Sequence, residues 1–232
     1  MNDVIKEKLA LRAEKYNDPV WFEEDPISFP REFLKQGKRL EDIEIAAVFA
    51  AHFAWGRRAM IVRDCNRLFD HMDWRPYDYV MGGGYRDDDS SIHRTVKWSE
   101  VARICSRLKQ FYLSEPSLEV LGIDDIRTRI YGQKEDRRSA CKKINRMKRG
   151  MVRDDGKVDL GLWKSTDKRD LLIPLDVHVY DEASALGLTS RKQKDRITAA
   201  EITDAFREIW PEDPCKGDFA LFGYGIDGKS ED

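Results

Sequence analysis

Apolar residues recur at helical spacing along most of the chain, and the alternation typical of a half-buried strand is scarce. Residues 2–16 and 98–112 each place apolar side chains on one side of a helix, between charged residues. In residues 41–55 the apolar side chains instead surround the helix, a pattern typical of a helix in the middle of a domain. The pattern therefore predicts an all-α fold.

Turn and capping signals divide the rest of the chain into further helices. These are predicted over residues 57–72, 139–153, 178–186 and 198–210, with shorter pieces over 118–130. Residues 21–30 contain Pro26 and Pro30 and are expected to form an extended connector. Asp176 is expected to cap the helix that follows it, and Thr198 begins a sequence that resembles a capping box.

The length of the chain, 232 residues, is sufficient for a sizeable core. We expect a single compact unit over residues 1–232, with a central helical bundle over 40–153 and a second helical lobe made of 1–39 with 154–232. A composition of 36% charged and 41% hydrophobic residues is typical of a soluble globule. We expect a cytoplasmic, nucleoid-associated monomer that does not contact a membrane.

Four cysteines are scattered along the chain without a Cys-x-x-Cys spacing. They predict reduced thiols, with no disulfide and no iron–sulfur cluster. The four histidines are equally dispersed, so neither a metal nor another cofactor is expected.

Positive charge is concentrated in one stretch, although the net charge is −2. Eight basic residues and no acidic residue lie between positions 137 and 153. A protein of nearly neutral charge can still bind a polyanion through one basic face. The eight are Arg137, Arg138, Lys142, Lys143, Arg146, Lys148, Arg149 and Arg153.

Lys142 and Asp176 are the candidate catalytic pair. The lysine lies in this basic stretch, and the aspartate follows 34 residues later in Leu171–Asp181. Cleavage of an N-glycosidic bond in DNA needs an amine that can attack carbon and a carboxylate. It also needs positive charge that attracts nucleic acid, which the basic stretch around the lysine supplies. Each residue also has an ordinary role, the lysine as a solvated side chain and the aspartate as a helix cap.

These residues resemble those of the helix–hairpin–helix base-excision DNA glycosylases, in which a lysine of a basic helix precedes an aspartate that opens a helix. The variable loop and Ile173-Pro-Leu-Asp-Val-His-Val179 carry the likeness, which is closer to the archaeal 8-oxoguanine DNA glycosylases than to the endonuclease III branch. Across nearly the whole chain, motifs such as Ala54-Trp-Gly-Arg-Arg58 and Asp218-Phe-Ala-Leu-Phe-Gly223 resemble a family of conserved hypothetical bacterial proteins placed beside that superfamily.

The resemblance implies a two-lobed glycosylase that excises a damaged base, such as an oxidised purine, from double-stranded DNA. Lys142 would be the nucleophile and Asp176 the carboxylate that activates it, facing each other across a cleft between the lobes. Trp55 would either fill the gap left by a flipped base or be a core tryptophan. The Gly-x-Gly hairpin that binds phosphate in most relatives is absent before Lys142, so phosphate binding is assigned to Arg137, Arg138, Lys143 and Arg149. Arg57 is a further expected DNA-binding residue.

Two alternatives stay open at this point. The chain can be a non-catalytic DNA-binding protein on the same scaffold, or a helical interaction protein whose basic face binds an acidic partner. Lys143 is adjacent to Lys142 and cannot share its helix face, so only one of the two amines should serve the site.

Overall fold

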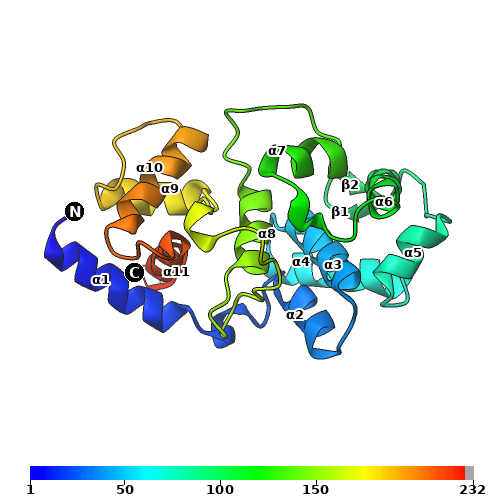
Figure 1. Ribbon diagram of the computed structural model, residues 1–232, viewed down its shortest axis with the longest axis horizontal. Helices are drawn as coiled ribbons and strands as arrows, with labels where there is room; N and C mark the ends of the chain where they lie inside the picture. Colours follow the sequence, from blue (N-terminus) through cyan, green and yellow to red (C-terminus); the bar gives the residue numbers. More distant parts are fainter. Residues whose placement is uncertain (228–232) are drawn as a thin grey trace. The chain divides into compact units, whose positions relative to one another are not determined.

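The regular secondary structure of the protein is mostly helical (Figure 1). A computed structural model describes residues 1–227, with side chains described for residues 1–223. In this part of the chain there are eleven α-helices and one two-stranded hairpin, so the predicted all-α class is confirmed. The elements are α1 (Asp3–Tyr16), α2 (Ser28–Lys35), α3 (Leu40–Phe53), α4 (Arg58–His71), α5 (Pro76–Gly82), β1 (Ser91–His93), β2 (Val96–Lys97), α6 (Trp98–Tyr112), α7 (Ile123–Asp125), α8 (Lys142–Val152), α9 (Val177–Ala185), α10 (Arg196–Arg207) and α11 (Gly217–Asp227).

The chain forms two compact units, and their boundaries differ from those predicted. One unit is Phe22–Glu135, and the other combines Met1–Trp21 with the residues from Asp136 onward. The predicted bundle over 40–153 would have included the basic helix. In the structure α8 instead belongs with the chain ends, and Arg153, the residue that follows α8, pairs with Asp213 at 2.7 Å. Residues 228–232 of the predicted second lobe lie outside the described residues.

Helix α3 lies at the centre of the unit Phe22–Glu135, as its apolar circumference predicts. All residues from Asp42 to Phe53 are buried, and α2, α4 and α5 pack against this helix. A buried carboxylate, Glu44, accepts hydrogen bonds from Tyr112 Oη at 2.8 Å and Ser117 Oγ at 2.6 Å. Because its oxygens are satisfied by partners, the carboxylate can remain in the core.

The second unit is built on the packing of α1 against α11, with α9 on α11 (Figure 1). Gly223 of α11 lies against the ring of Tyr16, where a Cβ atom would clash. The core of this unit contains Leu9 of α1, Ile173 and Leu175 of the segment before α9, and Phe206 of α10. The segment that carries Asp176 is therefore anchored in this core by its own apolar residues.

Three local predictions were wrong. Residues 21–30 are not an extended connector, since α2 begins at Ser28 and holds Pro30 in its first turn, where a missing N–H costs little. The N-cap of α10 is Asp195, whose carboxylate accepts the N–H of Thr198 at 2.9 Å. The short hairpin of β1 and β2 was not expected from the pattern.

The structure bears on the cysteines and on the length and polarity of the helices. All four cysteines are buried and none is in a disulfide, and burial raises the pKa of Cys65, Cys105 and Cys215 well above the usual range. Within residues 1–227, every helix is too short or too polar to cross a membrane.

Candidate active site

Lys142 is the first residue of α8, and the residues before it hold it in place. Cys141 has a φ of 45°, a left-handed conformation that L-residues rarely adopt and that costs on the order of 1–2 kcal/mol. The Cys141 N–H donates to Ser139 Oγ at 3.3 Å, and the side chain of Asn145 donates to the carbonyl of Ala140 at 2.7 Å. The start of the helix is therefore fixed by its own contacts.

Asp176 is the N-cap of α9, as predicted. Its Oδ1 accepts the backbone N–H of Val179 at 2.8 Å. Ile173, three residues earlier, is fully buried, and its N–H donates to Thr203 Oγ1 at 3.1 Å. Asp176 is thus positioned by its cap contact with α9 and by the core packing of the segment that precedes it.

The fold brings the two candidate residues together. Lys142 Nζ lies 2.8 Å from Asp176 Oδ2, and the two side chains are 34% and 27% exposed. Burial raises the pKa of the Asp176 carboxyl, but the hydrogen bonds from Lys142 and the Val179 N–H and the charge of Arg146 lower it more, so its pKa lies below the usual value. Both residues belong to the unit that contains the chain ends, so the pair is not shared between two lobes as predicted.

This arrangement can transfer a proton between an amine and a carboxylate at a half-exposed position. An ammonium group must lose a proton before its nitrogen can act as a nucleophile. Asp176 Oδ2 is within the distance at which a general base accepts that proton. Lys143 also lies half-buried on α8, but the contact with Asp176 is made by Lys142.

The other basic residues of the predicted face do not all reach the surface. Arg137 and Arg138 are exposed. Arg149 is only 3% exposed, and its guanidinium pairs with Asp218 and with Asp159, the latter at 3.3 Å. The prediction that Arg149 contacts DNA phosphate is therefore wrong. The side chain is buried, and its charge is neutralised by carboxylates inside the unit.

We expect Arg149→Met to destabilise the protein by about 3–5 kcal/mol, since it removes the ion-pair partner of the buried carboxylate of Asp218 and leaves the buried Asp159 with Arg153 as its partner. Urea denaturation followed by circular dichroism measures the free energy of unfolding. Arg138→Met is the matched control, with an expected change within about 0.5 kcal/mol because the residue is exposed. Equal effects of the two substitutions would contradict a structural role for Arg149.

Trp55 and Arg57 belong to the other unit, Phe22–Glu135. Trp55 is half-buried, and the guanidinium of Arg94 lies over its ring, 4.3 Å from the centroid. Its carbonyl oxygen is 3.0 Å from Nε2 of the buried His93, whose Nδ1 is 2.8 Å from Asp64 Oδ2. Arg57 is exposed at the N-cap of α4.

Sequence reasoning missed this buried Asp64–His93 contact, which holds the turn that carries Trp55. The two residues lie 29 positions apart, in a helix and in the hairpin that was not predicted. Neither residue belongs to a recognisable spacing, so the sequence offers no signal for the contact.

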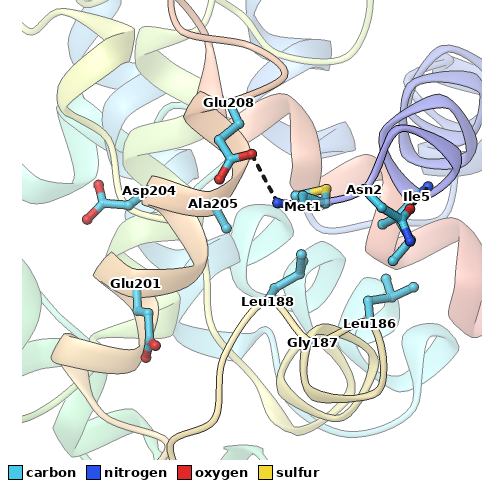
Figure 2. A pocket seen from close by; sticks show the side chains of 10 residues that line it. All are labelled: Met1, Asn2, Ile5, Leu186, Gly187, Leu188, Glu201, Asp204, Ala205 and Glu208. Carbon is cyan, nitrogen blue, oxygen red and sulfur yellow. Dashed lines mark hydrogen bonds and ion pairs between the residues drawn. The ribbon is translucent and has the colours of Figure 1, made fainter.

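A pocket of about 540 Å³ lies in the unit that contains the chain ends, between α1, α10 and the connection after α9 (Figure 2). The carboxylates of Glu201, Asp204 and Glu208 lie on the α10 side of the pocket. Glu208 Oε2 forms an ion pair with the N-terminal amine of Met1 at 3.3 Å. Neither Lys142 nor Asp176 lines the pocket, and its carboxylates repel phosphate. It is lined by Met1, Asn2, Ile5, Leu186, Gly187, Leu188, Glu201, Asp204, Ala205 and Glu208.

Comparison with known families gives one match. A family model described as "Protein of unknown function (DUF2400)" matches residues 25–136 and 123–227. No curated protein and no solved structure matches the chain.

Proposed function

Because the chain belongs to the DUF2400 family of proteins of unknown function, we propose its activity from the Lys142–Asp176 pair itself. The protein is a DNA glycosylase with associated lyase activity, which removes a damaged base through a Schiff base on Lys142. An oxidised purine such as 8-oxoguanine is the proposed lesion, by resemblance to the glycosylases whose lysine and aspartate occur in this order.

One observation carries the proposal. An amine and a carboxylate that are 34 residues apart in the sequence lie 2.8 Å apart in the structure, at the beginnings of two helices. An exposed ion pair contributes only about 0–1 kcal/mol, so stability alone gives little reason for this pairing. The pair instead has the components of an activated lysine nucleophile.

The reaction follows from these two groups. Asp176 accepts a proton from the Lys142 ammonium, directly or through water, and Nζ attacks C1′ of a nucleotide flipped out of the duplex. The bond from C1′ to the base breaks, and the base leaves with the electron pair and takes up a proton. Loss of the second amine proton and opening of the sugar ring, with O4′ becoming a hydroxyl, give the Schiff base.

Strand cleavage is the second part of the proposed activity. The Schiff base acidifies the protons at C2′, so one of them can be removed while the C3′–O3′ bond breaks and the phosphate leaves. Water then hydrolyses the imine and releases Lys142. The negative charge of Asp176 stabilises the cationic sugar that forms as the base departs.

The proposed partner is double-stranded DNA that carries a lesion, bound by a monomer in the cytoplasm at the nucleoid. Arg137 and Arg138 are exposed just before the nucleophile, and their charge supports binding of a polyanion. Trp55 as the residue that fills the gap of the flipped base, with Arg57 beside it, stays a prediction.

Borohydride trapping tests the function. The protein is incubated with duplexes that carry 8-oxoguanine, uracil or an abasic site, and borohydride then reduces any imine to a stable covalent adduct. We expect an adduct with the 8-oxoguanine and abasic duplexes and little with uracil. Absence of an adduct on every duplex, with binding retained, would favour the non-catalytic DNA-binding alternative.

A further inference from the structure

Two basic segments of the chain lie side by side, and the first of them directly precedes Lys142 in the sequence. Residues 136–139 precede α8, and residues 191–196 lead into α10 (Figure 1). An isolated antiparallel bridge joins Ser139 to Asp195. The Arg196 N–H donates to the Arg138 carbonyl at 2.8 Å, and its Nε donates to the carbonyl of Ser139 at 3.3 Å.

Each segment is also held by side-chain contacts of its own. Asp136 Oδ1 accepts the N–H groups of Arg138 and Ser139 at 3.0 and 3.2 Å. In the second segment, Tyr180 Oη donates to the carbonyl of Arg191 at 2.7 Å, and Thr198 Oγ1 donates to the carbonyl of Gln193 at 2.6 Å. A surface that is already ordered loses little conformational entropy when it binds a partner.

The paired segments present exposed positive charge. Arg137 and Arg138 come from the first segment, and Lys192 and Lys194 come from the second. The two segments also contain two acidic residues. The carboxylate of Asp136 accepts the N–H groups of Arg138 and Ser139, and that of Asp195 caps α10 and accepts the guanidinium of Arg191 at 2.9 Å. Lys194 lies 3.5 Å from Asp181 and is 40% exposed, so its charge is only partly offset.

This surface lies next to the candidate pair along the chain. Ser139, which carries the bridge, is three residues before Lys142. Three residues span at most about 11 Å even when fully extended. A strand whose phosphates contact the two segments therefore runs within a few nucleotides of the Lys142 amine.

We infer that residues 136–139 and 191–196 form the phosphate-binding surface of this unit. Arg137 and Arg138 on one side and Lys192 and Lys194 on the other contact the phosphates of a DNA duplex. One part of the inference rests on the proposed function, namely that the bound strand presents a sugar to Lys142. The binding of phosphates by the two segments does not depend on it. Lys192 and Lys194 lie outside the basic stretch of residues 137–153, and the surface requires no Gly-x-Gly hairpin.

The test is the salt dependence of binding to an undamaged duplex. The affinity of the variant Lys192→Gln/Lys194→Gln is measured by fluorescence anisotropy at several salt concentrations. Each lost phosphate contact lowers the slope of log K against log salt by about 0.9, so we expect the slope to fall by about 2. Arg137→Gln/Arg138→Gln changes the other segment and should reduce the slope equally. The matched control, Lys157→Gln/Lys164→Gln, removes two exposed charges of the same unit.

The inference fails if the slope stays the same in either test variant, or if the control lowers it equally, since the second result would mean a general charge effect. Tighter binding of an RNA duplex of the same length would exclude DNA as the partner of this surface. The two proposals fail separately. A reduced slope without borohydride trapping would support the phosphate-binding surface and contradict the lyase activity. Trapping with an unchanged slope would support the lyase activity and contradict the surface.

Discussion

Replacing Lys142 with glutamine should abolish borohydride trapping on both the 8-oxoguanine and the abasic duplex. Glutamine has a similar length and helix propensity, and it stands at the first position of α8, so the helix is retained. It has no basic amine with which to form an imine. Affinity for the duplex should stay within a few-fold, because one charge among several contributes little to the counterion effect.

The matched control is Lys143→Gln, which removes the same charge from the next residue of the same helix. Successive residues on a helix point about 100° apart, so this side chain does not share the position of Lys142. We expect trapping by this variant at a level close to that of the wild type. The reverse result, with trapping kept in Lys142→Gln and lost in Lys143→Gln, would identify Lys143 as the nucleophile.

Asp176→Asn should slow base release by about 10²-fold or more, measured in a single turnover with the protein in excess. The carboxylate has a pKa below the usual value, so it is charged at neutral pH and faces the amine. The amide cannot accept the ammonium proton and offers no negative charge to the cationic sugar. DNA affinity should change much less than the rate.

Asparagine separates the two roles of Asp176, because it caps helices about as well as aspartate. The N-terminus of α9 should therefore remain intact, with a change in unfolding free energy of about 1 kcal/mol or less. Asp195→Asn makes the same change at the cap of α10, without a lysine amine in contact, and its base release should match the wild type at saturating protein. Equal rates of base release for Asp176→Asn and the wild type would show that Asp176 acts only as a helix cap.

The pair also predicts how stability depends on pH. Because the pKa of Asp176 is lower in the folded protein than its ordinary value of 3.8, its contribution to stability is present above that value and is lost as pH falls through the folded pKa. The difference in unfolding free energy between the wild type and Asp176→Asn should therefore shrink in acid.

Local structure could be read from the sequence where neighbouring residues decide it. The burial of α3 follows from apolar residues on all sides of one helix, and the cap at Asp176 follows from its place before an apolar helix. Thr198 was misassigned as the start of its helix because two capping residues, Asp195 and Thr198, lie within one turn of each other. Local signals identified both catalytic candidates but carried no information on the distance between them.

The tertiary structure decided which of these residues meet. Lys142 Nζ lies 2.8 Å from Asp176 Oδ2 because α8 and the segment before α9 pack in one unit. Arg149 was indistinguishable in the sequence from its exposed neighbours, yet its side chain points into the interior and is neutralised by Asp159 and Asp218. Helix periodicity and capping depend on residues within one or two turns, so the sequence determined the helices and their ends. Contacts between residues tens of positions apart depend on how whole helices pack, which single-residue patterns do not encode.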